Sequence, residues 1–419
     1  MKKRIISAAI ALIVLVASLT SCLVEKIEDT TPAPTTPAPT TPAPTTPAPT
    51  TPAPTTPAPT TPAPTTPAPT TPAPTTPAPT TPAPVDPDPP VEPDLTDYFK
   101  NPMTGIESTR DYLNLRPIAL VISNQKSVIG HQYGISTADV IYEFLAEGGV
   151  TRLLMLTYDY ENVSQFGPIR SARDYALEIA MLHDAIVVHA GGSASAYEVI
   201  SQKALDTIDG INNGGALEYF YRANSTLDSY NTYMTSGSKL VSAVLHVRGM
   251  YTNAPIRNVS SPAATSYFKF SENGVFAGAI GTAKTITIEY LISFLGTSDN
   301  VTKLTFNPIT GKYLKFINDV AQTDAANGAQ LAFDNVLILK ATTTRLSSST
   351  IDIDLTQGGS GYYCNNGKYL TIQWSYNAER NQIVLKTSDG DILEMATGKT
   401  FVSIISGSNT GINSNVVFE

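Results

Sequence analysis

Three arginines lie close together in the sequence and could bind an anion. Arg152 follows the Gly148-Gly149 pair by three residues, and Arg170 and Arg173 flank the start of a run with helical spacing of apolar residues. Guanidinium groups bind phosphate or carboxylate through paired hydrogen bonds, and the first N–H groups of a helix favour negative charge. We therefore expect one anion-binding face, with Ser171 capping the helix.

An alternative interpretation of these arginines is structural. Arg152 and Arg173 could pair inside the fold with Glu143, Glu147 or Asp174, which would hold a hairpin against the helix. Buried pairing of this kind would stabilise the fold without offering a binding surface. The sequence leaves both interpretations open.

A second candidate anion site is the turn Gly191-Gly192-Ser193, which lies between a predicted buried strand and a predicted helix. Such a turn can cradle a phosphate, but a tight connection between a strand and a helix needs glycine in any case. Ser193 also resembles the nucleophile of an elbow motif, except that Ser195 replaces the closing glycine and His246 is the only downstream histidine.

The elements around these residues predict an α/β or α+β domain over residues 104–250. The double glycine joins two β-type runs as a hairpin, over residues 140–146 and 150–158. Continuous apolar runs at 116–124 and 184–190 are typical of buried strands. Helical spacing predicts helices over 171–183 and 194–204, and strands that alternate with helices build layered folds.

The residue pattern changes after residue 254, where helical spacing becomes rare and β-type runs take over. A mainly β domain is therefore predicted over residues 265–419. Ten short runs rich in β-branched and aromatic residues are separated by Gly, Asn and Asp turns. These runs are Tyr267–Phe270, Thr285–Tyr290, Lys303–Asn307, Tyr313–Ile317, Asn335–Ala341, Thr350–Leu355, Gly361–Cys364, Leu370–Ser375, Ile383–Thr387 and Thr400–Ile405.

The N-terminus predicts export and a lipid anchor. Lys2, Lys3 and Arg4 precede an apolar core, and residues 1–21 are typical of a secretory signal. Leu19-Thr20-Ser21-Cys22 resembles the lipobox of bacterial lipoproteins, which predicts that Cys22 is diacylated and becomes the new N-terminus. We expect the protein on the extracytoplasmic face of the cell membrane, held there by this lipid.

A disordered stalk is predicted over residues 22–97. From Thr30 to Pro84 the chain repeats Thr-Thr-Pro-Ala-Pro in eleven copies. Two prolines in each unit and the lack of large apolar side chains exclude a core and favour polyproline II, which at about 3.1 Å per residue could span roughly 170 Å.

Charge and cysteine content exclude several classes of function. The formal charge is −9, and it becomes −12 once the three basic residues of the signal are removed, so binding of nucleic acid over a broad face is not expected. Cys364 would have no partner once Cys22 is acylated, and it is expected as a buried strand residue. The histidines lack metal-ligand spacing, and Asp352 and Asp354 alone are too few for calcium, so no metal or cofactor is expected.

Several motifs resemble the YerB-like family, bacterial lipoproteins of unknown function with paired N- and C-terminal DUF3048 domains. The resemblance covers most of the chain beyond the stalk. In the first domain it depends on residues 116–119, 138–143, 147–152, 167–173 and 191–193, and in the second on residues 307–313, 335–339, 367–374 and 398–400.

Two departures from the family pattern favour binding over catalysis. Ser123-Asn124 stands where the family usually has Asp-Asn, and Tyr230-Asn231 stands where it usually has His-Asn. The first predicted function is therefore a binding or scaffolding lipoprotein of the cell envelope that recognises an anionic wall polymer or a wall-synthesis protein. The alternative is an envelope transferase that acts on polyprenyl-linked phosphate through the arginines, which would need a metal-binding carboxylate beside them.

Overall fold

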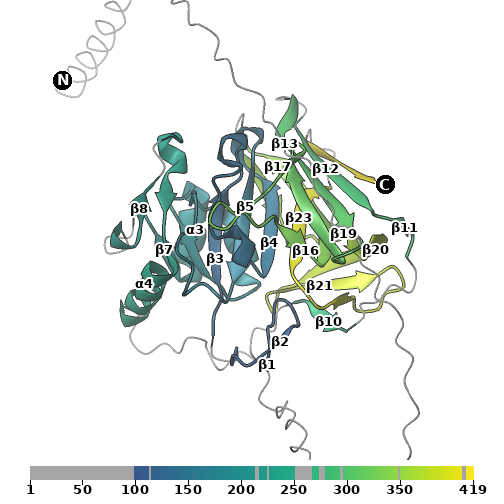
Figure 1. Cartoon of the computed structure of the whole chain (residues 1–419), viewed down its shortest axis with the longest axis horizontal. Coiled ribbons are helices and arrows are strands. Elements are labelled where there is room, and N and C mark those ends of the chain that lie inside the picture. The colour runs from purple at the N-terminus through teal and green to yellow at the C-terminus, as the bar shows by residue number, and fades with distance from the viewer. Residues whose placement is uncertain are drawn as a thin grey trace, which may run out of the picture. The chain divides into compact units, whose positions relative to one another are not determined.

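The computed structural model describes residues 99–112, 115–212, 217–223, 226–250, 267–272, 279–292, 296–347, 350–407 and 412–419 (Figure 1). The predicted signal, Cys22 and the repeat stalk lie outside these described residues. Within the described part of the chain, no helix is long and apolar enough to cross a membrane.

The predicted hairpin is present and lies inside a larger sheet. Strands β4 (Val140–Leu145) and β5 (Thr151–Thr157) pair antiparallel, and Gly148 between them has a φ of 69°, which favours glycine. Strand β3 (Ile118–Ser123) pairs with β5 on its other side. Every residue of these three strands is buried, because both faces of the sheet are covered.

Two parallel strands extend this sheet beyond β3. Strand β6 (Ile186–His189) pairs with β3, and β7 (Thr207–Asp209) pairs with β6. Both apolar runs that predicted buried strands, at 116–124 and 184–190, are thereby confirmed. Strands mixed with helices in this segment agree with the predicted α/β or α+β class.

The described residues of this segment form three α-helices: α2 (Asp174–Met181), α3 (Ala194–Lys203) and α4 (Gly237–Met250). The prediction for α3 is confirmed within one residue. Helix α2 begins three residues later than predicted, because Arg173 is still extended with φ −127° and ψ 151°. Ser171 is therefore not its cap, and its hydroxyl instead donates to the Ala190 carbonyl oxygen at 3.0 Å.

The second segment is built of strands, and each of the ten predicted runs overlaps one. The matching strands are β10 (Lys269–Ser271), β12 (Thr285–Ile292), β13 (Gly296–Asn307), β14 (Lys312–Ile317), β17 (Asn335–Arg345), β18 (Ile351–Asp354), β19 (Gly359–Asn365), β20 (Lys368–Asn377), β21 (Gln382–Thr387) and β23 (Thr400–Ser406). The mainly β prediction for this part of the chain is therefore confirmed.

The two segments share one twelve-stranded sheet (Figure 1). Strand β23 lies between β17 of the second segment and β4 of the first, and it runs parallel to both. The main path of the sheet is β11-β20-β19-β17-β23-β4-β5-β3-β6-β7, where β11 is Gly281–Thr282, with β18 and β21 attached to β17 and β20. The predicted boundary near residue 254 therefore does not separate two independent sheets.

A second sheet of six strands packs in the same compact unit. Its order is β15-β14-β13-β12-β24, with β16 paired to β14; β15 is Val320–Ala321, β16 is Ala332–Phe333 and β24 is Ile412–Phe418. Side chains of β14 alternate between half-buried and buried, as expected for a strand with one face on the core.

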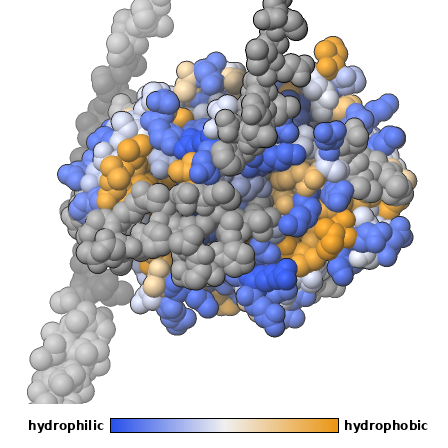
Figure 2. Space-filling model, turned by 90° about the horizontal axis from the view of Figure 1, so that it is seen from below, coloured by the Kyte–Doolittle hydropathy of each residue, from blue (hydrophilic) through white to orange (hydrophobic). Residues whose placement is uncertain are grey.

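Small strand pairs complete the described structure. They are β1 (Phe99–Lys100) with β2 (Glu107–Ser108), β8 (Tyr221–Arg222) with β9 (Tyr233–Met234), and β10 with β22 (Glu394–Ala396). Short 3-10 turns include η3 (Ile135–Thr137), η4 (Glu147–Gly149) and η6 (Ser229–Asn231). On the face drawn in Figure 2, hydrophobic areas are interspersed with hydrophilic residues.

Candidate functional site

Arg152 does not reach solvent at the hairpin tip. Its side chain is only 7% exposed, and its guanidinium donates to the Glu147 carboxylate at 3.1 Å and to the Ser171 carbonyl oxygen at 2.7 Å. Burial, and then the positive charge of Arg173, lower the pKa of Arg152 to about 10. Arg152 thus ties the hairpin to the segment that precedes α2.

Arg173 binds the same carboxylate. Its Nε donates to Glu147 Oε1, and its Nη1 donates to the Ala172 carbonyl oxygen at 2.6 Å. Burial raises the pKa of Glu147, but the hydrogen bond from Arg173 and the two guanidinium charges outweigh burial and lower it. The internal pairing that the sequence left open is therefore the arrangement seen for Arg152 and Arg173, with Glu147 as the shared acid.

Among the described residues Arg170 takes no part in these salt bridges, although the charges of Arg173 and Glu147 act on it. Its Nη1 donates to the Tyr230 carbonyl oxygen at 3.0 Å and to Asn231 Oδ1 at 3.3 Å, and its guanidinium carbon lies 5.9 Å from the centre of the Tyr230 ring. The three arginines therefore do not converge on one solvent-facing surface. Anion binding by Arg170 stays a prediction.

A cavity of about 130 Å³ opens beside Arg170. It is lined by Ile169, Arg170, Ser171, Ala190, Ile211, Arg222, Ser229, Tyr230 and Tyr233. We call this cavity the arginine–tyrosine pocket. Two of the predicted site residues, Arg170 and Ser171, line it.

Arg222 is the residue of this pocket that sequence reasoning missed. Its Nη1 donates to the Ser229 carbonyl oxygen and to Thr232 Oγ1 at 2.9 Å, and its guanidinium carbon lies 4.5 Å from the centre of the Tyr233 ring. Arg222 and Arg170 line the same cavity. No sequence spacing signals this, because the pairing of β8 with β9 positions Arg222 opposite Tyr233.

Tyr230 also lines the pocket and is 75% exposed. It is the residue that stands where the resembled family usually has histidine. The Asp228 carboxylate acts on Arg170 through its charge. Burial lowers the pKa of Arg170, and the negative charge of Asp228 opposes part of this effect. The Asp228 carboxylate accepts hydrogen bonds from the Tyr230 backbone N–H and from Asn231 Nδ2, both at 3.0 Å.

The polar groups of the Gly191-Gly192-Ser193 turn make hydrogen bonds within the protein. The Gly191 N–H donates to Asp209 Oδ1 at 2.8 Å, and the Ser193 N–H donates to the Ala172 carbonyl oxygen at 3.2 Å. Ser193 Oγ accepts from the Ala196 N–H at 3.1 Å and so caps α3. Gly191 has a φ of 76°, where glycine is favoured, so the geometry matches the alternative of a tight strand-to-helix turn.

Glu143, a candidate partner of the arginines, instead binds Lys315 of β14. Both side chains are fully buried, with Lys315 Nζ 2.9 Å from Glu143 Oε2. The carboxylate also accepts from Thr302 Oγ1 at 2.9 Å and from Thr151 Oγ1 at 2.8 Å. Burial lowers the pKa of Lys315, and the Glu143 charge opposes that effect.

Asn124 belongs to the same buried network. Its Nδ2 donates to Glu143 Oε1 and Thr151 Oγ1, and its Oδ1 accepts from Gln322 Nε2 at 2.9 Å. Gln322 Oε1 in turn accepts from Lys315 Nζ at 2.6 Å. This network connects the twelve-stranded sheet to the six-stranded sheet, and its full burial indicates a structural role.

Among the residues that the structure describes, no three His, Cys, Asp or Glu side chains lie together as a metal site would require. Cys364 is a buried residue of β19, as predicted, and burial raises the pKa of its thiol. Cys22 lies outside the described residues.

Comparison with known proteins identifies relatives along most of the chain. A family profile described as "Protein of unknown function (DUF3048) N-terminal domain" matches residues 103–250, and the corresponding C-terminal domain profile matches residues 292–402. A Bacillus subtilis (strain 168) protein named "Putative lipoprotein YerB" is 27% identical over 320 residues, which are 75% of this chain and 88% of that protein.

A solved structure is also similar. The crystal structure of YerB protein from Bacillus subtilis has a TM-score of 0.61 and 25% sequence identity to this chain. The match covers 76% of this chain and 99% of that one.

Proposed function

Since the chain belongs to the DUF3048 family of YerB-like proteins, we propose that it is a lipid-anchored lipoprotein of the cell envelope that binds an anionic wall polymer. The anchor is Cys22, and the protein acts on the extracytoplasmic side of the membrane. The observation that carries the binding role is the arginine–tyrosine pocket, in which Arg170 and Arg222 line one cavity.

The chemistry of this pocket suits a polymer of sugars or polyols joined by phosphodiesters. Arg170 and Arg222 use Nη1 for bonds within the protein, and among the described residues their Nε and Nη2 groups have no hydrogen-bond partner. These groups can donate to phosphate oxygens in pairs. The exposed Tyr230 offers a ring face and a hydroxyl group beside the arginines, as an amphipathic sugar unit requires. Tyr233 supports Arg222 with its ring, and its hydroxyl donates to the Gly210 carbonyl oxygen at 2.9 Å.

The N-terminal part of the chain supports the same role. A lipid at Cys22 followed by eleven proline-rich repeats would hold the pocket up to roughly 170 Å from the membrane surface, within reach of wall material. A wall-synthesis protein is the other partner that the sequence allowed. The pocket favours the polymer, because a cavity of about 130 Å³ admits a single small unit rather than a protein surface.

The test measures binding of poly(glycerol phosphate) to the full-length protein in detergent, with neutral dextran as the control polymer. Arg170→Gln and Arg222→Gln should each weaken binding by about 5- to 150-fold, because a hydrogen bond to a charged group contributes about 1–3 kcal/mol. Arg380→Gln is the matched control, since Arg380 is exposed and lies outside the pocket. Equal losses for all three variants would show non-specific attraction and would refute the proposed site.

The anchor is tested separately. Cys22→Ala should release the protein from the membrane fraction, because a diacylated cysteine is the proposed attachment. Retention of the variant in the membrane fraction with unchanged mass would contradict the lipid anchor without bearing on the pocket.

A further inference from the structure

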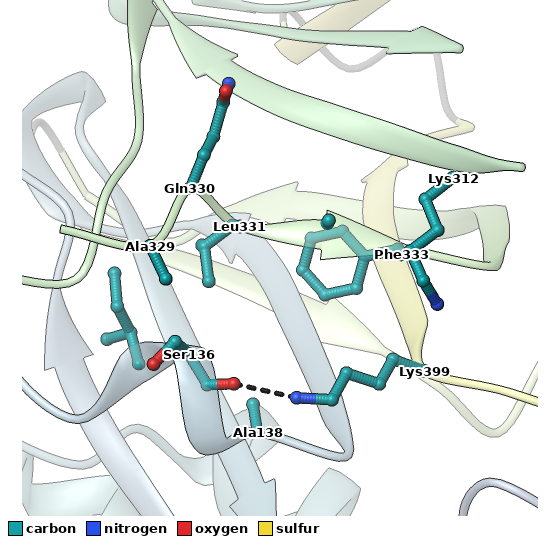
Figure 3. Close-up of a pocket in the computed structure, with 10 residues that line it drawn as sticks. Ser136, Ala138, Lys312, Ala329, Gln330, Leu331, Phe333 and Lys399 are labelled. Carbon is teal, nitrogen blue, oxygen red and sulfur yellow. Dashed lines mark hydrogen bonds between the residues drawn. The ribbon is translucent and has the colours of Figure 1, made fainter. Parts of the chain in front are cut away.

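A second and larger cavity, of about 230 Å³, lies where residues of the two sheets meet (Figure 3). Its walls come from η3, the start of β14, the segment that ends in β16, and the loop before β23. The lining residues are Ile135, Ser136, Ala138, Lys312, Ala329, Gln330, Leu331, Ala332, Phe333 and Lys399. A void that holds one water needs roughly 10–15 Å³ of such space, so this cavity can hold a small molecule.

Two lysines supply the only formal charges among these lining residues. Lys399 reaches under Phe333 toward Ser136 and donates one hydrogen bond, to the Ser136 carbonyl oxygen at 2.7 Å (Figure 3). Its other two N–H bonds have no partner among the described residues. Lys312 lies on the other side of the cavity and pairs with Asp334 Oδ1 at 2.6 Å.

Three nearby carboxylates do not line the cavity, and the charges of Asp139 and Asp334 attract the Lys399 ammonium and partly oppose the lowering of its pKa by burial. Asp334 Oδ2 accepts from the Lys399 backbone N–H at 2.9 Å. Asp324 accepts from the Gly134 and Ser136 N–H groups and from the Ser136 hydroxyl. Asp139 accepts from the Tyr158 N–H at 3.0 Å and from Asn101 Nδ2 at 3.1 Å.

The rest of the lining is mostly apolar. Ile135, Ala138, Leu331 and Phe333 are buried side chains that leave a hydrophobic wall, and the alanines at 329 and 332 leave space beside it. The two polar lining side chains are committed: Ser136 Oγ donates to Asp324, and Gln330 Nε2 donates to the Lys315 carbonyl oxygen at 2.9 Å. The cavity thus combines two ammonium groups, each with one hydrogen-bond partner, with a short apolar wall.

We propose that this cavity binds a small carboxylate that carries a short hydrocarbon body. One carboxylate oxygen would accept from Lys399 Nζ, and the hydrocarbon would pack on Phe333 and Leu331. A phosphate dianion could contact both ammonium groups, but it fits less well because it would leave the hydrophobic wall uncovered. The site is separate from the arginine–tyrosine pocket and does not depend on it.

The experiment titrates the full-length protein in detergent with butyrate, acetate, butyramide and inorganic phosphate, with binding followed by calorimetry. Butyrate should bind at least tenfold more tightly than butyramide, which has the same body without the charge, and more tightly than acetate, which lacks the body. Equal binding of butyrate and butyramide, or tighter binding of phosphate than of butyrate, would overturn the proposal.

Two variants and one control place the binding in this cavity. Lys399→Gln should weaken butyrate binding at least tenfold, whereas Lys386→Gln should leave it unchanged, since Lys386 is exposed on β21 outside the cavity. Ala329→Phe should abolish binding by filling the cavity while keeping both lysines, because Ala329 lines the cavity beside Ser136 (Figure 3). This variant decides the question if Lys399→Gln does not fold, and retained butyrate binding in a folded Ala329→Phe protein would overturn the proposal.

Discussion

The buried ion pair between Glu143 and Lys315 predicts a large loss of stability when one partner is removed. Both side chains are 0% exposed, so solvent does not screen their interaction. Lys315→Met keeps most of the side-chain volume but leaves the Glu143 carboxylate buried without its cation. Breaking a buried pair in this way costs about 3–5 kcal/mol.

Thermal denaturation is the assay for this loss. For a folded part of this size each kcal/mol shifts Tm by about 2 °C, so Lys315→Met should lower Tm by about 6–10 °C. Lys303→Met is the matched control, because Lys303 makes an ion pair with Asp319 at the surface and exposed pairs contribute about 0–1 kcal/mol.

A double variant tests whether the pair itself is responsible. Glu143→Gln combined with Lys315→Met removes both charges, so it should be more stable than Lys315→Met alone. If Lys315→Met lowers Tm no more than Lys303→Met does, the pair is not the buried link between the two sheets that its geometry indicates.

Three further predictions concern other groups. Arg173→Ala should lower the free energy of unfolding by about 1–3 kcal/mol in urea titrations, because Glu147, whose side chain is 25% exposed, loses one of its two guanidinium partners; a loss no greater than that of Arg380→Ala would contradict this. Burial raises the pKa of Asp139 to about 6 from an ordinary value of 3.8, so its contribution to stability is present below about pH 4 and is lost as the pH rises through about 6. Asp139→Asn should therefore show a smaller fall in Tm between pH 5 and pH 7.5 than the unchanged protein, and identical pH profiles would argue against it. Cys364 should resist thiol reagents in the native protein and react only in denaturant, because its side chain is fully buried and burial raises the pKa of the thiol.

Local patterns in the sequence predicted helices, strands and hairpins well where these depend on few contacts with distant parts of the chain. The double glycine predicted the β4–β5 hairpin, helical spacing predicted α3, and ten β-type runs each overlap a strand. Short-range backbone geometry and side-chain periodicity determine these features, and both can be read within about ten residues. The late start of α2 was missed because Ser171 bonds to the end of β6 instead of the helix.

The candidate site was less predictable, because contacts between distant segments decide which side chains reach solvent. Alternation along a strand places Arg152 on one side of β5, but every residue of β5 is buried, so neither side is open. Arg222 approaches Arg170 through the pairing of two-residue strands, and Lys315 reaches Glu143 from a different sheet. None of these approaches leaves a spacing signal in the sequence.

Strand β23 explains why the change from helical to β-type residue patterns near residue 254 does not mark the end of a sheet. All seven of its residues pair with β17 along one edge, and the first five, Thr400–Ile404, pair with β4 along the other, both in parallel. Parallel neighbours need long connections, so the partner of β4 is supplied by residues more than two hundred positions later in the chain. Residues 104–250 alone would leave the fully buried strand β4 as an open sheet edge, which invites pairing with other chains. The segments matched by the two DUF3048 profiles therefore complete one another, and β23 together with the Glu143–Lys315 pair joins them into a single folded part.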